Sequence, residues 1–401
     1  MSDFSRGPLS DLRVIEVGTL IAGPFCGQIL GDMGAEVIKI EPPGVGDPMR
    51  SWGRQKAGGK SLWWPVVARN KKAITLDLRQ AEGQQLLRDL VAKTDFLLEN
   101  FRPGTMEKWG CGYPELSRIN PGLIMIRVSG YGQTGPYASQ TGFGSIGEAM
   151  GGLRYVVGDP STPPSRMGIS IGDSLAGTFA AIGALSALHH RHITQRGQMV
   201  DSAIYEAVLN VMESLITEYD KGGYIRERTG AILPQIAPSN VYPTRDGSFV
   251  VIGANQDSIF ARLAEAMGEP GLAMQPEYRT HNARGAHQLE LDEHISAWTR
   301  SLSRDELLLK MQSFGVPAGL IYRAPEMLTD PHFKAREAII SVPHPDFGEL
   351  KMQNVVPKLS ATPGSVRTPS PALGQHNDEI FLDLLELEPA RYRELRDRGV
   401  I

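Results

Sequence analysis

The start of the chain alternates apolar strands with a helix, and this pattern restricts the possible folds most. In order, we expect a strand at Arg13–Val17, a loop at Gly18–Gly23, a helix from Pro24 to Met33 and a strand at Glu36–Glu41. Proline suits the first position of a helix, and Gly34 and the Pro42–Pro43 pair are typical stops. Two strands joined by a helix run parallel in one sheet, so the segment predicts a βαβ unit.

The same alternation continues as far as residue 219. Further strands are expected at 73–78, 96–100, 123–128 and 199–204, with helices at 80–93, 174–190 and 205–219. Between them, Gly142–Gly158 is rich in glycine, and we expect an irregular segment there. Strands alternating with helices predict α/β architecture, a doubly wound Rossmann-like parallel sheet.

The pattern changes after Asp220–Gly223. Two short strands at 240–242 and 249–252 flank a hairpin signal at Thr244–Gly247, and Ser303 with Glu306 forms a capping box that opens a helix. We therefore expect a large α/β domain from 1–220, a smaller inserted α+β domain at 224–323, and a return to the large domain over 324–401. The last part should hold a hairpin near Phe347–Gly348 and two helices.

Charge and cysteine content exclude several classes of protein. The net charge is −4, from 41 basic and 45 acidic residues, which argues against a nucleic-acid binder or a protein of anionic membrane surfaces. Two cysteines, Cys26 and Cys111, are too few for a disulfide scaffold. The N-terminus lacks the apolar core of a signal peptide, and the uncharged stretch Ser174–Leu188 is shorter than a span of about 20 residues. We expect a cytoplasmic protein.

Familiar nucleotide and metal motifs are missing. Gly18, Gly23 and Gly27 do not have the G-x-G-x-x-G spacing of a dinucleotide site, and Pro24 stands where a P-loop needs lysine. No HExxH or CxxC motif occurs, so we do not expect a metal site. We do not expect an α/β-hydrolase either.

One acidic residue remains as a candidate for catalysis. Asp173 lies between Gly172 and the helix expected from Ser174. An aspartate there is most often a helix N-cap, but a carboxylate held at a helix N-terminus is also a known covalent nucleophile. The residues alone leave both interpretations open.

Segments distributed along nearly the whole chain, in order, resemble the class III CoA-transferases, the superfamily of formyl-CoA transferase and carnitine CoA-transferase. They are Leu9–Gly18, Leu30–Glu41, Glu99–Gly104, Gly130–Pro136, Gly172–Ser174 and Leu373–Glu379. The resemblance implies that Asp173 attacks an acyl-CoA thioester, giving an aspartyl anhydride and then an aspartyl-CoA thioester. It implies acyl-CoA and carboxylate substrates, no permanently bound cofactor, and an interlocked homodimer.

The resemblance also assigns binding residues. Those implied to contact CoA are Leu20, Ile21, Ala22, Leu76, Arg79, Asn100, Phe101, Arg102 and Lys108. Those implied to line the substrate pocket are Trp52, Phe143 and Gln235.

Three departures from formyl-CoA transferase bear on the substrate. Pro42 replaces an arginine, Ile21 replaces a glutamine, and Leu233–Pro238 replaces a glycine loop. We therefore expect small dicarboxylates of the succinyl-CoA type rather than formate and oxalate. An alternative is a 2-methylacyl-CoA racemase, but Phe143 stands where those relatives carry histidine and cannot move a proton. A non-catalytic acyl-CoA-binding module is the third possibility.

Overall fold

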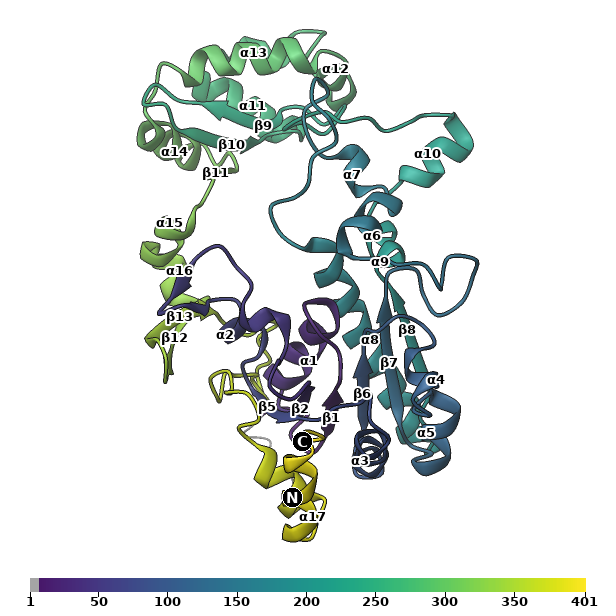
Figure 1. The fold of residues 1–401 in the computed structure, drawn as a ribbon. Coiled ribbons are helices and arrows are strands. Elements are labelled where there is room, and N and C mark those ends of the chain that lie inside the picture. Colours follow the sequence, from purple (N-terminus) through teal and green to yellow (C-terminus); the bar gives the residue numbers. More distant parts are fainter. Residues whose placement is uncertain (1–6) are drawn as a thin grey trace. The chain divides into compact units, whose positions relative to one another are not determined.

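The computed structural model describes residues 7–401, and contacts within the chain divide it into two compact units (Figure 1). The large unit comprises the chain up to Arg154 together with Met167–Thr217 and Lys334–Ile401. The small unit comprises Tyr155–Arg166 and Glu218–Phe333. The domain bounds 1–220, 224–323 and 324–401 stay predictions, and residues 1–6 of the first lie outside the described residues.

A six-stranded sheet forms the centre of the large unit. Its strands are β1 (Arg13–Glu16), β2 (Glu36–Glu41), β5 (Lys71–Thr75), β6 (Phe96–Glu99), β7 (Ile124–Ser129) and β8 (Met199–Ala203), in the order β5-β2-β1-β6-β7-β8. Every neighbouring pair is parallel. The order reverses between β1 and β6, as in a doubly wound fold. The predicted fold class is confirmed.

Helices cover both faces of this sheet. They are α1 (Ala22–Asp32), α2 (Trp64–Val67), α3 (Ala81–Val91), α4 (Thr105–Lys108), α5 (Tyr113–Ile119), α6 (Gly144–Met150), α8 (Ile171–Thr194) and α9 (Ile204–Asn210), with the 3-10 helix η2 (Pro48–Arg50). Helices α1 and α8 pack with Val14 and Leu98 on one face, whereas α3 and α5 pack with Ile15 and Leu97 on the other. Successive strand residues point to opposite faces, so each strand contributes to both cores.

The C-terminal segment returns to the large unit. Two hairpins, β3 (Lys56–Ala57) with β4 (Lys60–Ser61) and β12 (Ile339–His344) with β13 (Gly348–Gln353), are antiparallel, and the second confirms the predicted hairpin. The π-helix η4 (Glu379–Leu384) and α17 (Pro389–Asp397) follow. The amide of Asp77 donates to the carbonyl of Val400 at 2.8 Å, which ties the chain end beside β5.

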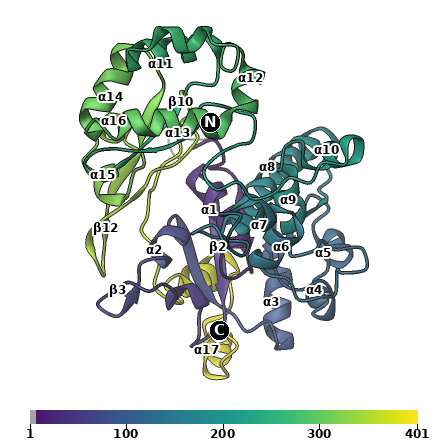
Figure 2. The same ribbon diagram turned by 90° about the horizontal axis from the view of Figure 1, so that it is seen from above.

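The small unit is α+β. Its antiparallel sheet β11-β10-β9 joins β9 (Ser239–Pro243), β10 (Phe249–Gly253) and β11 (Ala318–Leu320). Around it lie η3 (Pro270–Met274), α11 (Asp257–Met267), α12 (His281–Ala286), α13 (Gln288–Thr299), α14 (Arg304–Ser313) and α15 (Ala324–Thr329) (Figure 2). The hairpin and the Ser303–Glu306 capping box are confirmed. Three short helices cross the unit bounds: α7 (Leu153–Val156), α10 (Leu215–Gly222) and α16 (Pro331–Ala335).

Three local predictions are wrong. The glycine-rich segment after Gly142 is helical, forming α6 and α7, and the single helix expected from Tyr205 to Tyr219 is two helices, α9 and α10. Helix α1 begins at Ala22, so Pro24 is its third residue rather than its first. Proline is tolerated throughout the first turn because the amides there have no intrahelical acceptor.

Helix α8 is longer than the sequence indicated. Its 24 residues make it the one helix in the described chain that is long and apolar enough, by length and composition, to cross a membrane. The expectation that this stretch is too short is therefore wrong. The finding is weak evidence, because the core helix of a folded domain meets the same criterion, and Ala176, Ala180 and Ala184 of α8 are fully buried. The absence of a membrane role stays a prediction.

Candidate active site

The reversal of strand order places two loops together at the carboxyl edge of the sheet. Gly18–Ile21 follows β1, and Asn100 follows β6. The Asn100 side chain accepts a hydrogen bond from the Thr19 amide at 2.7 Å and donates to the Thr19 carbonyl at 2.8 Å. Ligands of open α/β sheets bind at such a switch point. The structure therefore brings Leu20, Ile21, Ala22 and Asn100 of the predicted CoA site to one place.

Close packing explains the glycines of this loop. A Cβ atom at Gly18 would lie 2.6 Å from Asn100 Oδ1, and one at Gly23 would lie 3.2 Å from Asn100 Cγ. The spacing of Gly18 and Gly23, which resembles part of a P-loop, thus lets the Asn100 side chain pack closely against the loop. The amides at the start of α1 point along a helix axis whose N-terminal end favours negatively charged groups such as phosphates.

Asp173 lies inside α8, which corrects the predicted helix start at Ser174. Helix α8 begins at Ile171, and Ser170 is its N-cap residue. Asp173 is the acidic residue of the first turn, where negative charge is stabilised by the helix dipole. Its side chain is partly exposed. An N-cap role for Asp173 is therefore excluded by the helix bounds.

The Asp173 carboxylate lies against the first residue of α6. A Cβ atom at Gly144 would lie 2.3 Å from Asp173 Oδ2 and 2.7 Å from Asp173 Cγ. A Cβ atom at Gly172 would lie 3.0 Å from Glu148 Cγ and 3.3 Å from the Gly144 carbonyl oxygen. Glycines at both positions let α6 and α8 meet at the carboxylate.

Glu148 lies beneath this contact and escaped the sequence analysis. Its side chain is 1% exposed, accepts a hydrogen bond from the Gly172 amide at 3.4 Å and pairs with Arg154 at 3.3 Å. A buried charged side chain that bonds the backbone beside Asp173 fixes the start of α8. The sequence feature that could have indicated Glu148 is the helical spacing of Gly144, Gly147 and Gly151, which flank it.

Helix α1, which follows the loop, packs against α8. A Cβ atom at Gly177 of α8 would lie 2.7 Å from the Ala22 carbonyl oxygen and 3.2 Å from the Cys26 amide. The start of α1 and the first turns of α8 are therefore in van der Waals contact within the large unit.

The other residues predicted to contact CoA lie outside the Gly18–Ala22 loop. Arg79 is 80% exposed and pairs with Asp77 at 2.8 Å, and its hydrogen bonds lower the pKa of Asp77 to about 2. Arg102 and Lys108 are exposed after β6, while Leu76 is only 2% exposed and lies in the core. The roles of these residues in binding CoA stay predictions.

Phe101 and Glu99 support the segment after β6. The Phe101 ring packs edge-on against Trp109 at 5.2 Å, and its amide donates to Glu99 Oε2 at 2.7 Å. Burial raises the pKa of Glu99 to about 7, although Arg127 at 2.6 Å opposes the shift. Glu99 was not recognised from the sequence because its partner is on the next strand.

The residues predicted for the substrate pocket come from both units. Phe143 is the N-cap residue of α6, 61% exposed, and directly precedes Gly144. Trp52 is 44% exposed and packs edge-on against Trp63 at 6.4 Å. Gln235 belongs to the small unit, has a positive φ of 65°, and its amide donates to Gln288 Oε1 at 3.0 Å.

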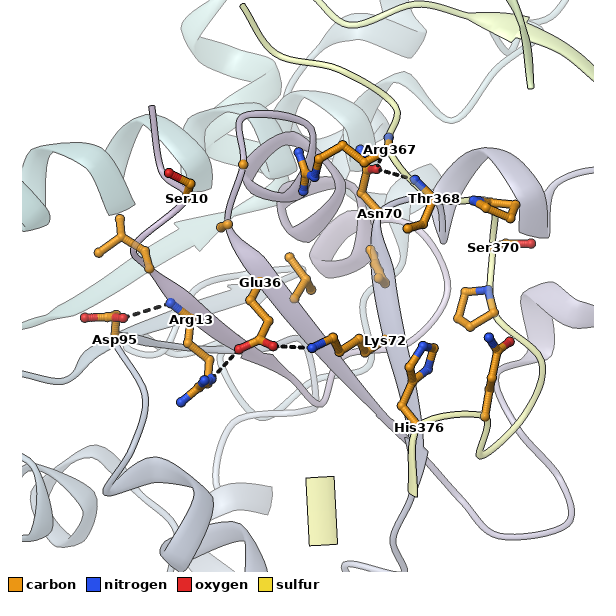
Figure 3. A pocket seen from close by; sticks show the side chains of 18 of the residues that line it. Ser10, Arg13, Glu36, Asn70, Lys72, Asp95, Arg367, Thr368, Ser370 and His376 are labelled. Atoms are coloured by element: carbon orange, nitrogen blue, oxygen red, sulfur yellow. Dashed lines mark hydrogen bonds and ion pairs between the residues drawn. The ribbon is translucent and has the colours of Figure 1, made fainter. Parts of the chain in front are cut away.

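A hollow of about 710 Å³ occurs at the opposite, amino-terminal edge of the sheet. Figure 3 shows that Glu36 accepts hydrogen bonds from Arg13 and from Lys72 in this hollow. None of the predicted site residues lines it. Within residues 7–401, no group of three or more acidic, histidine or cysteine side chains is arranged to hold a metal ion.

Comparison with known proteins identifies the family. The description "CoA-transferase family III" matches residues 9–377. The succinyl-CoA–D-citramalate CoA-transferase of Chloroflexus aurantiacus is 64% identical over 394 residues, 98% of each chain. The succinate–glutarate CoA-transferase of Agrobacterium fabrum is 34% identical over 389 residues, 96% of this chain and 97% of the relative. A solved CaiB/BaiF family protein from Brucella suis superposes with a TM-score of 0.84 at 33% identity, covering 94% of this chain and all of the other. The chain belongs to CoA-transferase family III, and it is a CoA-transferase.

Proposed function

We propose that this CoA-transferase moves CoA from succinyl-CoA to a small dicarboxylate, with citramalate as the first candidate, through covalent intermediates on Asp173. The observation that carries the mechanism is the partly exposed Asp173 carboxylate in the first turn of α8, bounded by Gly144. The substrate pair is supported by the printed function of the 64% identical relative.

The reaction balances as four exchanges at carbonyl carbons. An Asp173 oxygen attacks the thioester carbonyl, the C–S bond breaks, and a mixed anhydride and CoA thiolate form. The thiolate attacks the aspartyl carbonyl and releases the donor as its carboxylate, leaving an aspartyl-CoA thioester. The acceptor carboxylate attacks that thioester to give a second anhydride and thiolate. The thiolate then attacks the acceptor carbonyl, which yields the new acyl-CoA and restores Asp173.

Negative charge develops on oxygen in each step, and α8 presents its positive end to that oxygen. Glu148 holds the Gly172 amide at this end. Metal or redox chemistry takes no part in the proposed steps.

A substrate panel tests the first half of the proposal. The enzyme is incubated with succinyl-CoA and, separately, both citramalate enantiomers, malate, glutarate, oxalate and acetate, and new CoA esters are quantified by mass spectrometry. We expect citramalyl-CoA to form fastest among them. Transfer confined to oxalate or to acetate would refute the dicarboxylate assignment.

Two variants test the nucleophile. Asp173→Asn keeps the shape of the side chain but cannot form the anhydride, so transfer should be lost. Asp305→Asn is the control, because Asp305 is also an acidic residue in the first turn of a helix, α14, and is 81% exposed. Trapping the wild type with hydroxylamine should modify the peptide that carries Asp173. An adduct on another residue, or transfer retained in Asp173→Asn, contradicts the mechanism.

Two further expectations stay proposals. Large apolar side chains of α8 are exposed at Ile182, Leu185 and Ile193, which supports the predicted homodimer; light scattering should give twice the chain mass of 43.8 kDa. The cytoplasmic location follows from the intracellular use of acyl-CoA and from two buried thiols, Cys26 and Cys111, and cell fractionation tests it.

A further inference from the structure

A cluster of buried charges lies directly behind the Gly18–Ala22 loop. Its carboxylates are Glu16, Glu41 and Asp47, and its cations are Lys39, Lys71 and Arg50. The five members other than Arg50 are at most 2% exposed. Removing ions from water is costly, and well-packed apolar residues are often at least as stabilising as buried ion pairs. Stability alone is therefore a weak reason for the cluster, and the bonds it makes to the main chain indicate another role.

Lys39 connects the strands to the loop. Its Nζ lies 3.1 Å from Glu16 Oε1 and 2.9 Å from Asp47 Oδ2, and it donates to the Gly18 carbonyl at 2.7 Å. These contacts use all three donors of the ammonium group. Lys71 reaches the first turn of α1 from β5, donating to the Pro24 carbonyl at 2.7 Å while it pairs with Glu16 at 2.8 Å.

Asp47 contacts Leu20, two residues after Gly18 in the loop. Both of its carboxylate oxygens lie 3.3 Å from the Leu20 amide, and Oδ1 accepts from the Met49 amide at 2.9 Å. The Asp47 amide in turn donates to Glu41 Oε2 at 2.8 Å. Leu20 has a φ of 65°, a conformation that is strained for a non-glycine residue and persists only where the surroundings enforce it.

The cluster acts through geometry rather than through net charge. Counted at their formal charges, three positive and three negative groups cancel. Burial lowers the pKa of Lys71, and its Glu16 partner opposes this shift. Burial lowers the pKa of Lys39, but Glu16, Asp47 and Glu41 outweigh this effect and raise it, so the ammonium is retained. A neutral cluster adds little long-range attraction for the anionic phosphates of CoA.

We propose that Asp47, anchored by Lys39, is a positioning residue of the CoA site: it holds Leu20 in its left-handed conformation and thereby sets the loop that receives CoA. Asn100 fixes Thr19 from the other side. The inference rests on the proposed placement of CoA at this loop. It predicts that weakening the Asp47 contact impairs CoA binding while the steps on Asp173 proceed.

The test compares Asp47→Asn with Asp32→Asn. Asp32 is a matched control because it is 4% exposed, pairs with Arg69 at 2.6 Å and accepts a hydrogen bond from Asn70 Nδ2 at 2.7 Å, but it does not bond the loop. We expect the KM for succinyl-CoA to rise about tenfold or more in Asp47→Asn, as for one lost charged hydrogen bond, with kcat and the KM for the acceptor much less changed. In Asp32→Asn, the folded enzyme should keep its KM.

A second variant pair separates positioning from support of the fold. Glycine adopts a positive φ without strain, so the effect of Asp47→Asn on KM should shrink when Leu20→Gly is also present. An unchanged KM in Asp47→Asn, an equal rise in Asp32→Asn, or an undiminished effect in the Leu20→Gly background would each overturn the proposal.

Titration calorimetry with free CoA keeps this test independent of the reaction. CoA affinity should fall about tenfold in Asp47→Asn whether or not citramalate is the acceptor and whether or not Asp173 is the nucleophile. If the substrate panel or the Asp173 variants contradict the proposed function, the calorimetry still tests the role of Asp47 in CoA binding by itself.

Discussion

The contact between Gly144 and Asp173 leads to a sharp prediction for Gly144→Ala. The new Cβ would lie 2.3 Å from Asp173 Oδ2, whereas ordinary contact begins near 3.4 Å, so the atoms must separate by about 1 Å. The obstructing atom is the end of a side chain, and rotation of the Asp173 carboxylate is the cheapest response. Alanine is itself the better helix former by about 0.5–1 kcal/mol. We therefore expect little change in stability.

The expected loss is in catalysis. Displacing a reacting group by about 1 Å can cost about a hundredfold in rate, which is about 3 kcal/mol in the activation barrier. The assay measures kcat at saturating succinyl-CoA and citramalate, the amount of trapped aspartyl intermediate, and the unfolding temperature. Gly144→Ala should lower kcat about a hundredfold with a nearly unchanged unfolding temperature.

Two other helical glycines provide controls. A Cβ at Gly147, in the same helix, would lie 2.5 Å from Ile204 Cγ2, so Gly147→Ala should overpack the core and cost about 1–3 kcal/mol of stability while the folded enzyme keeps its kcat. Gly222 of α10 has nothing within 4 Å, and Gly222→Ala should change neither quantity. A normal kcat in Gly144→Ala, or an equal loss in Gly147→Ala, refutes the reasoning.

Four further outcomes are expected. Arg79→Ala should raise the pKa of Asp77 from about 2 toward 3.8, measured by NMR, because the Arg79 hydrogen bonds depress it; the stabilisation from this pair is present above about pH 4 and is lost as the pH falls toward 2. The same variant should weaken CoA binding about tenfold if Arg79 contacts a phosphate. Gln288→Leu removes hydrogen bonds to the backbone of Leu233, Gln235 and Ile236 and should cost about 3 kcal/mol in urea denaturation. With Phe143 beside the site, a 2-methylacyl-CoA in heavy water should gain no deuterium at the α carbon, and exchange at the turnover rate would favour the racemase.

The parallel sheet was predictable because its signal is local. Continuous apolar runs such as Leu123–Ile126 are fully buried, as strands covered by two helix layers must be. The capping box at Ser303 was equally predictable from the sequence, since both of its partners lie within four residues. Prediction succeeded where the residues that determine an element are close in sequence.

Helix α6 shows why other features were missed. Its glycines lower helix propensity, and by propensity alone the segment is irregular. In the structure Gly147 and Gly151 admit Ile204 and Val208 of α9 at distances no side chain would allow, so tertiary packing outweighs propensity. The buried cluster around Lys39 was missed for a related reason: its contacts join different strands, and no spacing along the chain records them.

The close contact between α1 and α8 limits where substrate preference can change. A Cβ at Gly177 would lie 2.7 Å from the Ala22 carbonyl oxygen, so a shift of α1 itself would also move the helix that carries Asp173. Changes that select one acyl group over another are better tolerated outside this pair of helices. Exposed positions such as Trp52 and Phe143 meet that condition. Substitutions there should alter the ratio of citramalate to malate or glutarate transfer while CoA affinity stays constant, whereas Gly177→Ala should impair transfer to every acceptor alike.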